Sequence, residues 1–204
     1  MELHLWLSFV IICFLGALSP GPSLAVVLKN TINGGYKSGS ATAISHGFGV
    51  TLYAIISITG IGIVIAESPA LFNLIKYAGA AFLLYLGVKG LMSKKSAVLV
   101  KDQSEETNKS VNGWRDGFLI AFLNPKLAIF FIALFSQFVQ PDASWLQQFI
   151  LVATVGTLDT LWYLIVAFFI SREAFLNKLH RNSHIIDRIA GSVLVLLAIR
   201  VVTT

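Results

Sequence analysis

The stretch LSPGPSLAVV, residues 18–27, interrupts an apolar run that extends from Leu5 to Leu28. Within it, Pro20 and Pro22 flank Gly21. A proline inside a helix removes a backbone donor and collides with the carbonyl four residues earlier, so we expect a broken helix here. The consequence of such a break depends on the solvent that surrounds it.

Composition indicates that this solvent is a lipid bilayer. Of the 204 residues, 56% are apolar and only 12% are charged, which is typical of membrane proteins. A helix needs roughly 20 apolar residues to cross a hydrocarbon core of about 30 Å. Six windows meet this length, and they predict an all-α, polytopic membrane protein with spans near 5–28, 41–66, 70–92, 117–138, 147–170 and 185–202.

The first window is expected to be a membrane span and not a signal peptide that is cleaved off. A secretory signal peptide begins with positive charge, whereas this chain begins MELHLW, with Glu2 and no Lys or Arg. Cys13 is the only cysteine, which excludes an internal disulfide and a two-thiol redox relay.

Basic residues gather in alternate connections between the predicted spans. By the positive-inside rule these connections are cytoplasmic, and both termini are predicted to lie outside. The net charge of +5 then reflects topology and affinity for anionic headgroups, not nucleic-acid binding. The residues on the basic side are Lys29, Lys37, Lys89, Lys94, Lys95, Lys101, Lys109, Arg115, Arg172, Lys178, Arg181 and Arg188, against only Lys76 and Arg200 on the other side.

The two halves of the chain carry similar motifs in the same order. FLGALSPGPSLAVV, SHGFGVTLYAII and YAGAAFLLYLGVKGL in the first half correspond to FLIAFLNPKLAIFF, ATVGTLDTLWYLIV and RIAGSVLVLLAIRVV in the second. Because each unit has three spans, the second must be inverted relative to the first. We therefore expect repeats over residues 1–92 and 117–204 joined by a cytoplasmic linker over 93–116. Inverted repeats are typical of transporters, whose sites lie between the repeats at broken helices.

The prolines of the first span free backbone carbonyls at membrane depth. Each unpaired group costs several kcal/mol in lipid, so this backbone must face protein or a water-filled cavity. The hydroxyls of Ser19 and Ser23 and the bare backbone of Gly21 suit such a cavity.

A matching break is predicted in the fourth span at Pro125, between Asn124 and Lys126. A single membrane proline is often a simple packing kink. Paired breaks at corresponding places in two repeats favour a binding site instead.

One acidic residue, Asp159, lies in the middle of a predicted span. A carboxylate there costs about 2.5 to 3.5 kcal/mol on insertion scales, so it should be paired, protonated or hydrated. We interpret it as a proton-coupling or amino-group-binding residue; the alternative is a structural ion pair with Lys126, which could also extend to the cytoplasmic edge. His46, near the cytoplasmic end of the second span, could relay protons or serve only as a polar cap.

Glycines are expected to mark close helix contacts, since packing drives helix association in lipid. They are Gly47, Gly49, Gly60, Gly62, Gly79, Gly87 and Gly90. Enzyme motifs, metal-ligand clusters, cofactor fingerprints and the charged rings of a channel are all missing from the sequence. We therefore expect neither an enzyme nor a protein that needs a metal or cofactor.

Five motifs together resemble the LysE/RhtB family of amino-acid exporters over essentially the whole chain. They are SPGPS, GYKSG, KYAGAAFLLYLGVKGL, GFLIAFLNPKLAIFF and AGSVLVLLAIRVV. The resemblance implies a six-span protein of the bacterial inner membrane that exports amino acids in exchange for protons. The family pattern falls on Ser19, Pro20, Gly21, Pro22, Asn124, Pro125 and Lys126, with Ser23 where many relatives have Asn.

The expected ligands are thus an amino acid and protons. Two alternatives stay open: an uptake carrier of the same fold, and a membrane scaffold or sensor that moves no cargo. The amino-acid class and the oligomeric state, a homodimer included, are not determined by the sequence.

Overall fold

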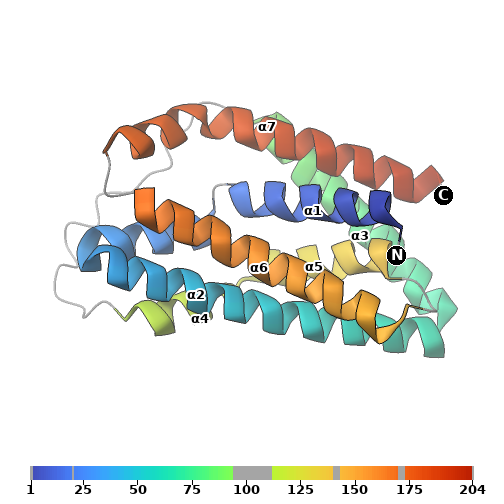
Figure 1. Cartoon of the computed structure of the whole chain (residues 1–204). Helices are drawn as coiled ribbons and strands as arrows, with labels where there is room; N and C mark the ends of the chain where they lie inside the picture. The colour runs from blue at the N-terminus through green and yellow to red at the C-terminus, as the bar shows by residue number, and fades with distance from the viewer. Residues whose placement is uncertain (1, 20, 94–111, 140–142, 170–172, 204) are drawn as a thin grey trace.

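The computed structural model describes residues 2–19, 21–93, 112–139, 143–169 and 173–203. Within these ranges the regular secondary structure is entirely helical, as predicted. Both termini lie at the same end of the molecule (Figure 1). The helices are α1 (Leu3–Leu18), α2 (Pro22–Glu67), α3 (Pro69–Leu91), α4 (Gly113–Phe122), α5 (Pro125–Phe138), α6 (Trp145–Phe169) and α7 (Glu173–Thr203).

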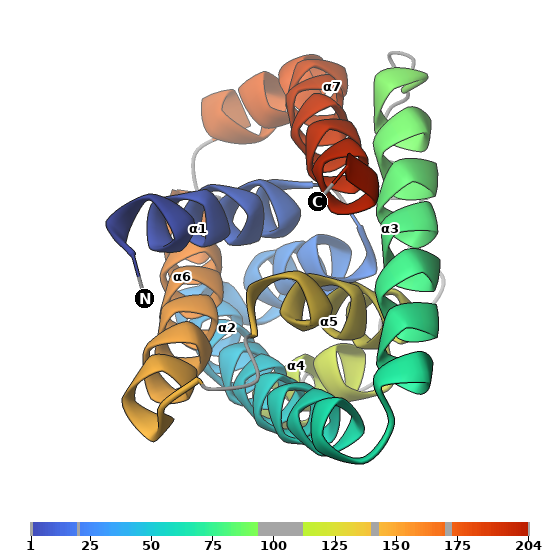
Figure 2. The same cartoon turned by 90° about the vertical axis from the view of Figure 1, so that its right-hand side faces the viewer.

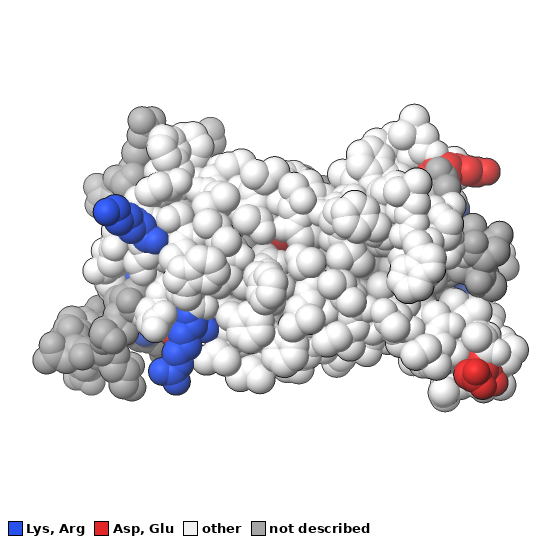
Figure 3. Space-filling model, turned by 60° about the horizontal axis from the view of Figure 1, so that its bottom comes forward, with Lys and Arg blue, Asp and Glu red and all other residues white. Residues whose placement is uncertain are grey.

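Among the described residues, three helices, α2, α3 and α6, are long and apolar enough to cross a membrane, and the bent pair α4 and α5 makes a fourth candidate. The face in Figure 3 has a broad band nearly free of charge, with Lys and Arg at one end and Asp and Glu at the other. This distribution fits a protein whose middle lies in lipid and whose ends meet water.

The first predicted break lies between α1 and α2. Helix α1 ends at Leu18, and α2 begins at Pro22 with Gly21 as its N-cap. The prediction that this span ends near residue 28 was wrong. Helix α2 continues past that residue and first bends at Gly35, where φ is +69°. Glycine tolerates this left-handed conformation, which lets the chain turn and continue as helix. The motif GYKSG, residues 35–39, therefore begins at this bend and continues as helix.

The second break separates α4 from α5 by a bend of 54°. Pro125 occupies the first turn of α5, where its missing N–H is not needed. Helix α4 begins at Gly113, inside the segment that the sequence predicted as linker. The rest of that linker, residues 94–111, falls outside the described residues.

The helices of the two halves pack against each other. Helix α2 lies against α4 and α6, and α3 lies against α7 and α5, an arrangement that is visible along the helix axes in Figure 2. Most of the predicted glycine contacts are close: a Cβ at Gly79 would lie 2.9 Å from the Cα of Ala133. Gly60 and Gly62 have no such neighbour among the described residues, so the prediction was wrong for that pair.

The main apolar core joins the two halves as well. Phe9 of α1 packs against Phe135 and Phe138 of α5, with ring centroids 5.9 and 5.3 Å apart. This core extends from the end that holds the termini towards the two helix breaks, where a cavity begins.

Candidate functional site

A cavity of about 830 Å³ lies between the helices of the two halves. Its walls come from α1, α2, α3, α5, α6 and α7, and from the residues at both helix breaks. This volume is in the range of small-molecule binding sites, about 300 to 1,000 Å³.

The residues predicted from the sequence meet at this cavity. Nine of the ten are on its walls, and the tenth, Pro20, falls outside the described residues. The nine are Ser19, Gly21, Pro22, Ser23, His46, Asn124, Pro125, Lys126 and Asp159.

The break between α1 and α2 supplies one wall. Gly21 caps α2 but has no side chain, and no side-chain hydrogen bond caps this helix. The first backbone N–H groups of a helix carry partial positive charge, so an uncapped start is suited to an anion. Ser23, in the first turn, is buried beside the hydroxyl of Tyr163.

The break between α4 and α5 supplies a second wall. Here the Asn124 side chain accepts a hydrogen bond from the Lys126 backbone N–H at 3.0 Å. The start of α5 is therefore already capped, unlike the start of α2. The Lys126 side chain is exposed. Its ammonium is attracted by the charge of Asp187 and repelled by that of Lys89.

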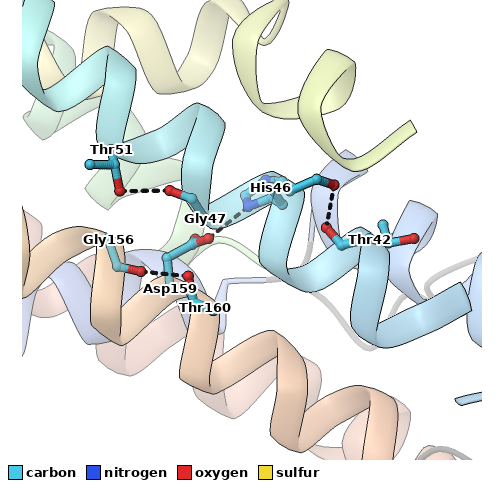
Figure 4. Close-up of polar contacts among 8 residues, drawn as sticks. Thr42, His46, Gly47, Thr51, Gly156, Asp159 and Thr160 are labelled. Carbon is cyan, nitrogen blue, oxygen red and sulfur yellow. Dashed lines mark hydrogen bonds and ion pairs between the residues drawn. The ribbon is translucent and has the colours of Figure 1, made fainter. Parts of the chain in front are cut away.

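Asp159 of α6 pairs with His46 of α2, and not with Lys126. His46 Nδ1 lies 2.7 Å from Asp159 Oδ2, and the two side chains are 1% and 9% exposed. Figure 4 shows this contact between α2 and α6. His46 is buried against Asp159, which does not fit the alternative of an interfacial polar cap.

The His46 ring is held on a second side by Tyr163, one turn beyond Asp159. The two rings meet edge to face, with centroids 4.9 Å apart and an interplanar angle of 77°. The second ring nitrogen, His46 Nε2, is buried and has no hydrogen-bond partner among the described residues.

Asp187 of α7 is a cavity residue that the sequence did not reveal. Its carboxylate accepts hydrogen bonds from the hydroxyls of Ser19, at 3.3 Å, and Ser93, at 2.9 Å. Because Asp187 precedes Arg188 at the start of an apolar stretch, it is indistinguishable from an ordinary interfacial residue in the sequence. Only the packing of α7 on α3 brings it to the cavity.

Comparisons with known proteins identify the family of the chain. The family model described as LysE type translocator matches residues 14–204. An uncharacterized membrane protein of Bacillus subtilis (strain 168), YrhP, is 31% identical over 95% of this chain and 96% of its own length. The leucine efflux protein of Enterobacter sp. (strain 638) is 29% identical over 86% of this chain and 82% of its own.

An uncharacterized membrane protein of Vibrio cholerae is 28% identical over 79% of this chain and 78% of its own. No solved structure matches the chain. The family model covers nearly the whole sequence, including both helix breaks and the His46–Asp159 pair. The chain therefore belongs to the LysE type translocators, a family of membrane transporters.

Proposed function

We propose that this protein exports amino acids from the cytoplasm in exchange for protons. The observation that carries the proposal is the cavity, which collects two helix breaks and a buried histidine–carboxylate pair from opposite halves of the chain. The relative from Enterobacter is named a leucine efflux protein, which supports the direction and the substrate type.

The proposed architecture is six spans in two inverted repeats, residues 1–92 and 117–204. Reciprocal contacts between the halves support it. A Cβ at Gly47 would meet Thr160, and a Cβ at Gly156 would meet Thr51. Gly87 and Gly191 are related in the same way, because a Cβ on either would meet the backbone carbonyl of the other. A two-fold axis between the halves generates such exchanged pairs.

The proposed location is the bacterial inner membrane, with both termini outside. The described residues support this orientation, because most of their Lys and Arg side chains on the face in Figure 3 lie at the end opposite the termini. Lys89 and Lys126, at the exposed part of the cavity wall, lie towards the basic end. The cavity would therefore load from the cytoplasm, as an exporter requires.

We propose that the amino acid binds as a zwitterion between the two breaks. Its carboxylate would meet the N–H groups at the start of α2, which no side chain caps, rather than the start of α5, which Asn124 caps. Its ammonium would meet the His46–Asp159 pair or the carbonyls at the end of α1. Half-helix ends hold charged substrate groups in this way in other transporters.

The walls of the cavity favour an apolar substrate side chain. Between the two polar regions they are formed largely by aromatic and aliphatic residues, among them Phe82, Leu86, Leu127, Phe130, Phe131 and Leu194. Burying a leucine side chain here would contribute about 1.5 to 3 kcal/mol relative to water. Leucine and its branched relatives are thus the first substrates to test.

Inward proton movement would supply the driving force. At a potential of about 100 mV, negative inside, each entering charge contributes roughly 2.3 kcal/mol. Export against a concentration gradient therefore follows if each outward step of the amino acid requires one inward proton.

The test is amino-acid efflux from bacteria that overproduce the protein and are loaded with dipeptides. The medium is analysed by mass spectrometry beside cells with an empty vector and cells with Asp159→Asn. Selective appearance of one amino-acid class, lost in the variant, supports the proposal. If the concentration of every amino acid in the medium equals that of the empty-vector cells, with the protein verified in the membrane, the proposal is refuted.

A further inference from the structure

The two nitrogens of His46 have different surroundings. Nδ1 is bonded to Asp159 Oδ2 at 2.7 Å, while Nε2 has no hydrogen-bond partner among the described residues although it is buried. A buried polar atom without a partner costs about 1 to 3 kcal/mol. Such an atom in a cavity wall suggests a partner that arrives and leaves.

The contact with Asp159 fixes what Nε2 can do. When His46 is neutral and Asp159 is ionised, Nδ1 carries the hydrogen and donates it to the carboxylate, so Nε2 is an acceptor. The pair then has a net charge of −1. When one proton is added, Nε2 becomes a donor and the pair is neutral, however the proton is shared between the two residues.

The other titratable groups near the pair do not replace it as the group that exchanges a proton for a ligand. From α6 and α1, the titratable neighbours are Tyr163 and Cys13, both uncharged when protonated. On α3, α5 and α7, the titratable groups of the described cavity wall are Tyr85, Lys89, Lys126 and Asp187. Helix α4, which packs on α2, carries Arg115 and Asp116. The two carboxylates named here already have partners: Asp187 accepts hydrogen bonds from Ser19 and Ser93, and Asp116 accepts one from Asn30. The His46–Asp159 pair is therefore the carboxylate-bearing group of the described cavity wall that retains an unpartnered atom.

We propose that the substrate ammonium and one proton compete for the His46–Asp159 pair, with His46 Nε2 as the atom that takes either. The inference rests on the proposed function and adds its coupling device. A neutral Nε2 accepts an N–H of the ammonium, and the charge of −1 attracts it. A protonated Nε2 offers a hydrogen instead of a lone pair, and the pair no longer attracts a cation.

Competition at one atom makes the exchange obligatory. Binding of the ammonium requires that the proton leave Nε2 for water, and rebinding of a proton on the other side requires that the ammonium leave. Since the zwitterion is neutral, each cycle moves one amino acid outward and one positive charge inward. A carrier that bound both together would move them in the same direction.

The first test uses the purified wild-type protein in detergent and L-leucine as the probe. In weakly buffered solution, binding should release up to one proton for each leucine bound. Below the pH at which the pair titrates, the apparent Kd should rise about tenfold for each unit that the pH is lowered, as for any ligand that competes with one proton. N-acetyl-L-leucine, which lacks the ammonium, should neither bind at this pair nor release protons, whereas isoamylamine, which lacks the carboxylate, should release them.

The second test compares His46→Gln with His4→Gln, a matched change at an exposed histidine far from the cavity. Glutamine keeps an acceptor but cannot take a proton in this range. His46→Gln should bind leucine more weakly, with an affinity that does not change with pH and without proton release. His4→Gln should behave as wild type. If His46→Gln does not fold, proton release by the wild type decides the question.

Two failures are distinguishable. No binding or counterflow by the wild type, in liposomes, with leucine or any other amino acid would refute the proposed function. Amino-acid binding with no proton release and with a Kd independent of pH would leave the exporter intact and refute the competition. Unchanged pH dependence in His46→Gln would also refute it.

Discussion

Gly47 and Gly156 occupy equivalent positions in the contact between α2 and α6, each packed against a threonine of the opposite helix. Each glycine also accepts, through its carbonyl, a hydrogen bond from the threonine one turn later on its own helix: Thr51 at 2.7 Å for Gly47, and Thr160 at 2.7 Å for Gly156. Figure 4 shows both bonds beside the His46–Asp159 pair. This close contact sets the distance between the helices that carry the pair.

A methyl group at either glycine should therefore destabilise the protein. We expect Gly47→Ala and Gly156→Ala each to lower the free energy of unfolding by about 1 to 3 kcal/mol, as overpacking does elsewhere. Thermal unfolding in detergent measures the loss. Thr160→Ala should restore stability to Gly47→Ala but not to Gly156→Ala, and Thr51→Ala should do the reverse. Rescue of both by the same threonine change would contradict the exchanged contacts.

Asp159→Asn separates coupling from structure. The asparagine oxygen can still accept the hydrogen of His46 Nδ1, so we expect the protein to be inserted and folded, with proton-coupled efflux lost. Asp159→Ala, which leaves Nδ1 without a partner, should also lower stability by about 1 to 3 kcal/mol. Membrane yield and unfolding temperature are measured beside efflux. An unfolded Asp159→Asn would make Asp159 a structural residue.

Pro22→Ala tests the break between α1 and α2. Alanine supplies the backbone N–H that proline lacks and permits the helix to extend towards Leu18, which would remove the uncapped start of α2. We expect efflux to fall more than membrane yield. A variant with normal efflux would show that the break is only a packing feature.

Asp187 is expected to hold the end of α3 and the segment after α1 against α7. Ser93→Ala removes one of its two described hydrogen bonds and should reduce efflux severalfold with little loss of stability. The matched control is Ser192→Ala, because the Ser192 hydroxyl bonds only to the Arg188 carbonyl of its own helix among the described contacts. Equal efflux from the two variants would mean that Asp187 does not shape the cavity.

The helix breaks were predictable because they depend on local chemistry. Proline cannot continue a helix, and membrane-depth backbone must be paired or hydrated, so Pro22 and Pro125 marked the cavity without knowledge of the fold. The polar residues beside them lie on its wall for the same reason. The helical class followed equally from the length of the apolar windows.

The partner of Asp159 was not predictable because it depends on how α2 and α6 are rotated about their axes. The sequence analysis offered Lys126 as the partner, whereas the packing of α2 against α6 brings His46 to Asp159. Asp187 was missed for a similar reason, since the packing of α7 on α3 decides whether it faces the cavity or water. The bend at Gly35 falls between the first two predicted spans, but the helix on either side of it was not predicted, because Asn33, Gly34 and Ser38 are weak helix formers.

The most direct test of the central claim uses Cys13, the only cysteine, which is buried in the wall of the cavity. The rate at which a small methanethiosulfonate labels Cys13 is measured in purified, transport-competent protein with and without the exported amino acid. If the native thiol is too slow to label, Ser19→Cys in a Cys13→Ser background presents a thiol on the same wall. Protection that grows with amino-acid concentration, half-complete near the concentration that half-saturates transport, is the expected result. Equal labelling rates at saturating amino acid would contradict the claim that this cavity is the substrate site.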